Sequence, residues 1–400
     1  MFKVVALLAS IMSGSKDHFV KAKVVLCLRR KGEAVYQLLE ERGMLDTTCK
    51  PQTVGEMLAL PIRVDVQEKE VRDLLLLTLK LEIQFDEISL TRAALSKNPH
   101  DRLCRLVKSW LSQHIREPYD AYLPFIPQKW QLLGDLVVVP ETAFISERWL
   151  DLLNKISLDE RQTFWHHVAQ ALGGERLARQ HAIAKDQHRT SQTEMLFGTD
   201  GWVEFLDHGV QFGFDATKVM FSSGNVTERR RIGTMDMQDE VVVDAYAGVG
   251  YYTLHMASRS QAKHVHACEI NPDSIAGLKW ACDANGFNKK VTIHQGDNRE
   301  TLPKLYGQAD RCHLGLLPSS EAVWEHALLC LKPGGGWLHI HMNVHKKDLE
   351  QWQQSTLETL NHLAQRNGRQ WSISANHLEQ VKWFSPHVWH VVLDVECQIL

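Results

Sequence analysis

Short apolar runs alternate with amphipathic segments along the C-terminal half of the chain. The runs are typical of buried strands, and the segments between them repeat apolar residues at helical spacing. The expected strands are 241–244, 264–269, 291–294, 311–317 and 337–342, and the expected helices run through Met256 and over 272–285, 320–331 and 348–366. Two more strands, 371–375 and 387–395, follow with no helix between them. This order predicts a parallel, doubly wound, Rossmann-like α/β sheet with an antiparallel pair at one edge.

The residues before position 231 show a less regular pattern. Residues 121–230 contain an expected strand at 136–139, a helix over 164–180, and short strands around 195–197, 202–206 and 210–214. This mixture predicts a small α+β domain. Residues 1–120 hold an expected helix over 71–89 and no visible chemistry. We therefore expect a region of unknown role over 1–120, an α+β domain over 121–230 and a Rossmann-like domain over 231–400.

Composition and charge narrow the classes of protein that fit. The net charge is −3, so any attraction to nucleic acid has to come from local basic surface. No apolar stretch reaches the roughly 18 residues that a membrane-spanning helix requires. The short run Val4–Met12 fits either a signal-peptide core or a buried strand. Eight scattered cysteines without a C-x-x-C pair predict reduced thiols in a cytoplasmic protein, rather than disulfides or a zinc site.

A glycine-rich turn lies between the strand at 241–244 and the helix after it. Its sequence is Asp244-Ala-Tyr-Ala-Gly248-Val-Gly250, and glycines in such a turn let the backbone bend sharply and a ligand come close. A dinucleotide site would have a third glycine at position 253, where this chain has Thr253. The turn therefore disfavours a ligand with a pyrophosphate, and a purely structural turn is the alternative.

Polar residues follow the next two expected strands. Glu269 ends the second strand and can accept hydrogen bonds from both ribose hydroxyls of a nucleoside. Asp297 and Asn298 follow the third strand, and either can bind an adenine amino group. Glu269 alone is equally explained as a surface carboxylate at the end of a strand. Because the carboxyl ends of parallel strands meet at one edge, the whole set predicts a site for S-adenosyl-L-methionine.

Two further features have competing interpretations. Pro318 follows the fourth strand at the position that faces the transferred group in this fold, but Ser319 and Ser320 beside it equally fit a helix cap. His339 and His341 share one face of the fifth strand and could bind a metal ion together. No supporting carboxylate or cysteine lies at a suitable spacing, so no metal is expected.

Several stretches, in a fixed order, resemble one known family. They are IPQKWQLLGDLVVVP, LGGERLARQ, GTDGWVEFLDHGVQFGFDATKVMFSSGNVTER, VVVDAYAGVGYYTL, HACEINP, IHQGDNR, LGLLPSSE, LHIHMNV and VKWFSPHVWHVVLDVE. They resemble the tRNA wybutosine-synthesising aminocarboxypropyltransferases, which are close relatives of the tRNA guanine-37 N1-methyltransferases. The resemblance runs from about Pro127 to the last residue, and it implies a class I S-adenosylmethionine-dependent fold.

Three features favour the wybutosine branch of this resemblance. The methyltransferases usually carry Asn two residues before the proline after the fourth strand, and this chain has Leu316 there. Tyr251, where the methyltransferases usually have Pro, and the LHIHMNV strand also resemble the wybutosine branch. The resemblance implies transfer of the 3-amino-3-carboxypropyl group of S-adenosyl-L-methionine to the tricyclic wyosine-precursor base at position 37 of phenylalanine tRNA, releasing methylthioadenosine. Guanine-37 N1 methylation, methylation of a small molecule and a non-catalytic cofactor-binding scaffold remain alternatives.

The resemblance also implies roles for individual residues. The implied donor-binding residues are Ser222, Arg229, Glu269, Asp297 and Asn298, beside Asp244, Gly248 and Gly250 of the turn. The candidate catalytic residues are Glu228, as a base, and Pro318, and the candidate tRNA contacts are Arg189, Asn225 and Arg231. Arg229 and His255 depart from the family pattern, which usually has Lys and Pro there. Residues 121–230 are expected to recognise tRNA or link the domains, and no obligate protein partner is expected.

Overall fold

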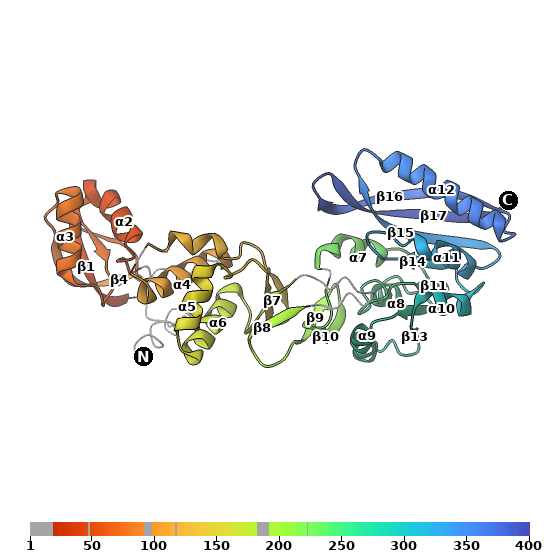
Figure 1. The fold of residues 1–400 in the computed structure, drawn as a ribbon, viewed down its shortest axis with the longest axis horizontal. Coiled ribbons are helices and arrows are strands. Elements are labelled where there is room, and N and C mark those ends of the chain that lie inside the picture. The colour runs from red at the N-terminus through yellow and green to blue at the C-terminus, as the bar shows by residue number, and fades with distance from the viewer. Residues whose placement is uncertain (1–18, 47–48, 92–97, 117, 182–191, 222) are drawn as a thin grey trace. The chain divides into compact units, whose positions relative to one another are not determined.

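The chain forms two compact units (Figure 1). The computed structural model describes residues 19–46, 49–91, 98–116, 118–181, 192–221 and 223–400. One unit holds the described residues up to Arg179 together with Leu196–Gly198, and the other holds the described residues of Gln180–Met195 and Thr199–Leu400. The run Val4–Met12 lies outside the described residues. The domain boundaries expected near 120 and 230 stay predictions.

The first unit begins with a four-stranded antiparallel sheet in the order β2–β3–β1–β4. Two helices bury Leu39 and Leu75 against Val25 and Leu60 of the sheet. The elements are β1 (Phe19–Leu28), α2 (Gly32–Glu41), β2 (Gln52–Val54), β3 (Met57–Pro61), α3 (Glu68–Leu79) and β4 (Gln84–Thr91). The region without visible chemistry is therefore a folded α+β structure.

Two helices expected from the sequence were wrong in extent. The helix expected over 71–89 ends at Leu79, because Lys80 adopts a left-handed conformation with φ 54° and the chain continues as β4 beside β1. The helix expected over 164–180 is α6 (Leu158–Leu172). It ends at Gly173, whose φ of 96° suits glycine, and β7 (Arg176–Gln180) follows. In both cases a left-handed residue stops the helix and a strand takes over.

The rest of the first unit surrounds an aromatic core. Trp110, Trp149 and Phe164 are buried together, with ring centroids 4.3 to 6.1 Å apart, and Phe144 meets Trp149 edge to face. The further elements are α4 (Pro99–His114), β5 (Gln131–Leu133), β6 (Leu136–Val139), α5 (Glu147–Lys155) and β8 (Thr193–Phe197). The strands form a sheet in the order β5–β6–β7–β8.

The second unit contains a seven-stranded sheet in the order β13–β12–β11–β14–β15–β17–β16. The first five strands in this order are parallel, whereas β17 pairs antiparallel with both β15 and β16. The elements are β11 (Val241–Asp244), α8 (Thr253–Ser258), β12 (His264–Glu269), α9 (Pro272–Asn285), β13 (Val291–Gln295), α10 (Asn298–Thr301), β14 (Arg311–Leu314), α11 (Trp324–Cys330), β15 (Gly335–His345), α12 (Leu349–Arg366), β16 (Trp371–Ser385) and β17 (Val388–Ile399). The expected α/β fold with its antiparallel edge is confirmed.

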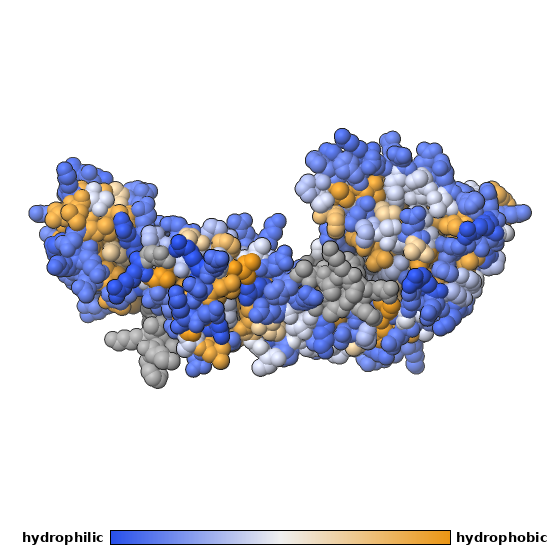
Figure 2. Space-filling view, in the orientation of Figure 1, coloured by the Kyte–Doolittle hydropathy of each residue, from blue (hydrophilic) through white to orange (hydrophobic). Residues whose placement is uncertain are grey.

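Helices lie near both edge strands of this sheet. Figure 1 shows α12 along the β16–β17 end and α9 near β13. Leu360 of α12 packs into the apolar core with Leu338 and Leu393 of the sheet. Figure 2 shows apolar residues as small patches scattered among polar ones on the visible face. Within the described ranges, every helix is too short or too polar to cross a lipid bilayer.

A hairpin precedes the sheet and packs closely on α9. It consists of β9 (Trp202–Asp207) and β10 (Val210–Asp215). Gly277 of α9 faces β10, and a Cβ there would lie 2.8 Å from the backbone oxygen of Gly213 and 2.8 Å from Cβ of Phe214. The close approach therefore requires glycine at position 277.

We predict that Gly277→Ala destabilises the protein by about 1–3 kcal/mol through overpacking. Helix propensity alone would act in the opposite direction, because alanine in a helix is about 1 kcal/mol more favourable than glycine. Urea unfolding monitored by circular dichroism measures the difference. Gly334→Ala is the control, since a Cβ at position 334 meets no atom within 4 Å. A Gly277→Ala protein more stable than the wild type would contradict the prediction.

Candidate active site

The glycine turn connects β11 to α8 at the carboxyl edge of the sheet. Gly248 and Gly250 have φ values of 56° and 98°, which residues other than glycine rarely adopt. Asp244 is fully buried and accepts a hydrogen bond of 2.7 Å from Oγ1 of Thr253. Thr253, which occupies the place of a third glycine, therefore ties the start of α8 to the end of β11.

Glu269 closes the turn from the end of β12. One carboxylate oxygen accepts the N–H of Gly248 at 2.7 Å, and the other accepts the N–H groups of Ile270 and Asn271 at 2.9 and 2.7 Å. Burial raises the pKa of Glu269, although these three N–H groups act in the opposite direction. The structure thus brings the expected ribose-binding carboxylate against the glycine turn.

The residues after β13 divide between two tasks. Asn298 donates from Nδ2 to the carbonyl oxygen of Ala245, 3.3 Å away, so it reaches the glycine turn. Asp297 instead caps α10 by accepting the N–H of Arg299 at 2.8 Å. It also pairs with the Arg299 side chain, and this hydrogen bond lowers the pKa of Asp297. Gly248, Glu269 and Asn298 therefore form one cluster, with Asp297 at its border.

Arg229 lies on α7 (Val226–Ile232), which follows the polar segment before the sheet. It is only 1% exposed, and its Nε donates to Asp207 of β9 at 2.6 Å. His255 of α8 lies 3.6 Å from the same carboxylate. Burial alone would raise the pKa of Asp207, but His255 and Arg229 lower it to about 2. Arg229 and His255 thus share one half-buried carboxylate, that of Asp207.

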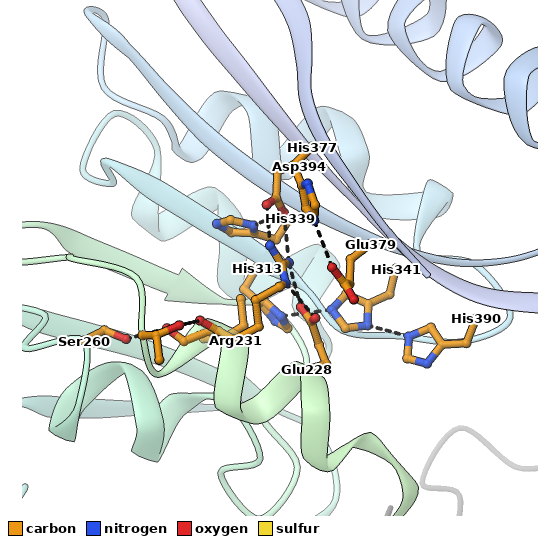
Figure 3. A network of polar contacts seen from close by, with 12 residues as sticks. Glu228, Arg231, Ser260, His313, His339, His341, His377, Glu379, His390 and Asp394 are labelled. Carbon is orange, nitrogen blue, oxygen red and sulfur yellow. Dashed lines mark hydrogen bonds and ion pairs between the residues drawn. The ribbon is translucent and has the colours of Figure 1, made fainter. Parts of the chain in front are cut away.

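Glu228 and Arg231 form a second buried ion pair on α7 (Figure 3). Both carboxylate oxygens of Glu228 accept from Arg231 at 2.8 Å, and Arg231 also donates to Asp394 of β17 at 2.6 and 3.2 Å. Burial raises the pKa of Glu228 in spite of Arg231. A raised pKa suits a general base, but proton transfer would have to compete with the ion pair. The charge of Arg231 is already balanced inside the protein.

A row of buried histidines runs beside this ion pair. His341 lies 3.0 Å from His313 on one side and 3.0 Å from His390 on the other (Figure 3). His313 reaches to within 3.6 Å of Asp244. Burial lowers the pKa of His390 to about 4 and holds that of His341 well below its ordinary value. His341 and His390 are therefore neutral at pH 7. The row connects the end of β11 to β17 through the interior of the sheet.

His339 belongs to the ion-pair network around Asp394. Its Nδ1 lies 2.6 Å from Asp394, and its Nε2 lies 2.7 Å from Arg311, which pairs with Glu240. Burial lowers the pKa of His339 to about 4. Among the residues that the structure describes, His, Cys, Asp and Glu side chains form no group of three that could hold a metal ion.

The remaining candidate residues come from the segment before α7 and from the segment after β14. Asn225 precedes α7, and its buried Oδ1 accepts no hydrogen bond from the described residues. Pro318 follows β14, and its carbonyl oxygen accepts the N–H of Asn343 at 3.0 Å. Ser320 accepts from the indole of Trp324 at 3.1 Å instead of capping the helix with its side chain, whereas Ser319 accepts the N–H of Glu321 at 3.1 Å. Ser222 and Arg189 lie outside the described residues.

Sequence reasoning missed the partners of the charged residues. Asp207 and Asp394 hold Arg229 and Arg231, although neither acid stood out as a candidate. The only available signal was that each acid lies in a stretch resembling the family, GTDGWVEFLDHGV and VKWFSPHVWHVVLDVE. Pairings between residues 22 and 163 positions apart carry no local pattern.

Comparison with known proteins identifies the family. Residues 204–370 match the TRM5/TYW2 methyltransferase domain, and residues 107–201 match the TYW2 N-terminal domain. A tRNA wybutosine-synthesizing protein 2 homolog of Danio rerio is 34% identical, over 94% of this chain and 100% of the relative. The tRNA wybutosine-synthesizing protein 2/3/4 of Arabidopsis thaliana is 41% identical over 76% of this chain.

The plant relatives are longer proteins, and the match covers only 29% of the Arabidopsis thaliana sequence and 30% of its Oryza sativa counterpart. Among solved structures, P. horikoshii TYW2 in complex with MeSAdo is 25% identical, with a TM-score of 0.58 over 74% of this chain and 99% of that chain. The match to the fish protein extends along nearly the whole length of both chains. The chain therefore belongs to the tRNA wybutosine-synthesizing protein 2 family.

Proposed function

We propose that the protein transfers the 3-amino-3-carboxypropyl group of S-adenosyl-L-methionine to the tricyclic wyosine-precursor base at position 37 of phenylalanine tRNA. The observation that carries this proposal is the match to tRNA wybutosine-synthesizing protein 2 over the whole relative. The solved relative is described in complex with MeSAdo, the thioether that loss of this group leaves behind. The chain is proposed to act in the cytoplasm, without an obligate protein partner or a metal ion.

The cluster at the glycine turn fits the nucleoside part of the donor. Glu269 is held by three backbone N–H groups, and the oxygen that accepts only the N–H of Gly248 keeps a lone pair for a ribose hydroxyl. Asn298 lies beside the turn and is assigned to the adenine, whereas Asp297, at the border, would have to give up Arg299 to accept the adenine amino group. The glycines leave room for the ligand to approach the backbone. We assign donor binding to these residues, with Asp244 as their buried support.

The amino-acid arm of the donor is assigned to the segment before and along α7. Arg229 supplies a buried positive charge, which Asp207 already balances. Ser222, outside the described residues, completes this assignment. The arm has to be oriented so that its Cγ, rather than the methyl group, meets the acceptor base. Orientation alone selects between the two products.

The transfer is a substitution at Cγ of the methionine arm. A bond forms between C7 of the acceptor base and Cγ while the bond between Cγ and the sulfonium sulfur breaks. The sulfur leaves as the neutral thioether methylthioadenosine, and the proton on C7 is then lost. Glu228, with its raised pKa, is the candidate acceptor of that proton, and Pro318 is assigned to the wall facing the transferred group.

RNA contacts are proposed from the basic residues and from the domain order. Arg189, outside the described residues, and Asn225 are the proposed contacts, whereas Arg231 is less available because two carboxylates pair with it. Residues 121–230 are proposed to recognise the tRNA or link the domains, and residues 231–400 to carry the chemistry.

We predict that Glu269→Gln raises the Kd for S-adenosyl-L-methionine about ten-fold or more. An amide loses the negative charge and presents an N–H group to backbone donors, so both the turn and the ribose lose an acceptor. Isothermal titration calorimetry measures the change. Glu300→Gln, an exposed glutamate on the neighbouring α10, is the matched control and should bind normally. An unchanged Kd in Glu269→Gln would contradict the assignment.

We predict that label from the carboxyl carbon of the donor, and not label from its methyl group, enters phenylalanine tRNA. The protein is incubated with hypomodified phenylalanine tRNA and with donor labelled at one carbon or the other, and tRNA radioactivity is counted. A tRNA with another base at position 37 is the control and should take up neither label. Methyl label in the tRNA would instead support guanine-37 N1 methylation, and donor binding without any transfer would support the scaffold.

A further inference from the structure

The antiparallel end of the sheet extends past the parallel strands. β15 pairs with β14 only as far as Ile340 but continues to His345, still paired with β17. Five more residues of strand add about 16 Å at about 3.3 Å per residue. This extension lies at the carboxyl edge of the parallel strands, the edge that also holds the glycine turn. The hairpin formed by β16 and β17 therefore extends beyond the parallel strands at the edge that holds the candidate active site.

Two large aromatic side chains lie exposed on this extended part of the hairpin. Trp383 is 50% exposed and Phe384 is 58% exposed, close to the end of β16. Trp383 stacks on Trp389 of β17, with ring centroids 3.8 Å apart and an angle of 23° between the planes. The pairing of β16 with β17 shifts register on either side of Trp383. Such bulges redirect side chains and are enriched next to active sites.

Positive charge accompanies the aromatic residues. Lys346 and Lys347 are exposed in the turn after β15, and the backbone N–H of Lys346 donates to His387 at the tip of the hairpin. Asp348 is the acidic neighbour in that turn. On the other side, Lys382 of β16 extends toward Gly224, where an added Cβ would lie 2.5 Å from its Nζ. Lys382 thus joins the hairpin to the segment that leads into α7.

We propose that Trp383, Phe384, Trp389, Lys346 and Lys347, here called the hairpin platform, bind an unpaired nucleotide of the RNA substrate next to the base that is modified. The proposal rests on the proposed function, because it takes RNA as the substrate. Single-stranded bases stack on exposed aromatic rings, and lysines attract the neighbouring phosphates. A purely apolar partner would not be favoured by lysines on both sides of the rings. The platform therefore fits an RNA loop rather than a paired stem.

The test measures RNA affinity without donor, so that it does not depend on which group is transferred. The full-length protein is titrated into two fluorescent RNAs, a stem-loop with the anticodon loop of phenylalanine tRNA and a fully paired duplex of equal length. In Trp383→Ala/Phe384→Ala, the platform predicts an affinity for the stem-loop about ten-fold or more lower, with little change for the duplex. Phe384→Ala alone should show a smaller loss in the same direction.

Tyr306→Ala is the matched control. Tyr306 is an aromatic residue, 39% exposed, that precedes β14 and so lies toward the amino ends of the parallel strands. Its removal should leave stem-loop affinity unchanged. Circular dichroism melting checks that each variant is folded. The Phe384→Ala variant also leaves the stack between Trp383 and Trp389 intact. Stem-loop affinity within about two-fold of wild type in folded Phe384→Ala and double variants would overturn the proposal.

Two other results would also overturn it. Equal losses for stem-loop and duplex would indicate general electrostatic binding rather than stacking. Unchanged RNA affinity combined with a loss of self-association in sedimentation would assign the aromatic residues to contacts between copies of the chain. Methyl transfer in the labelling experiment would refute the proposed reaction but leave the platform standing, so the two failures are distinguishable.

Discussion

Arg231 bridges two buried carboxylates, and this bridge determines where α7 can lie on the sheet. Glu228 and Asp394 are 166 positions apart in sequence, and both bind the same guanidinium. Breaking such a pair leaves an unpaired charge in the interior, which is strongly destabilising. Beyond Asp394 the network continues through His339 and Arg311 to Glu240, just before β11. The helix that follows the proposed donor-binding segment is therefore fixed to the strands that frame the glycine turn.

The ion pair between Arg229 and Asp207 balances the other buried positive charge on α7. Asp207, which lies on the preceding hairpin, neutralises the guanidinium of Arg229 at 2.6 Å. His255 of α8 approaches the same carboxylate. A planar guanidinium with several donors can bind a carboxylate on one side and keep other N–H groups for a second partner. Arg229 and His255 are thus linked through one residue, Asp207.

The sequence was informative where local rules decide the structure. In the second unit, Asn271 caps α9 and Gly286 ends it with a φ of 72°, so both ends of that helix are visible as residue types. The glycine turn, Glu269 and Asn298 were likewise predictable, because parallel strands bring their carboxyl ends together. In the first unit, α3 ends at Lys80, and no glycine or proline marks the stop. The histidine row and the acids that hold Arg229 and Arg231 depend on tertiary contacts, which no local pattern encodes.

The central claim is that the methionine arm of the donor is turned so that its Cγ faces the acceptor base. A crystal structure of the full-length protein with phenylalanine tRNA and a non-reactive donor analogue tests this claim most directly. The account predicts that Cγ lies in line with C7 of the tricyclic base, while the S-methyl group points away from the RNA. A complex with the S-methyl group aimed at the base and the arm directed away from it would contradict the account.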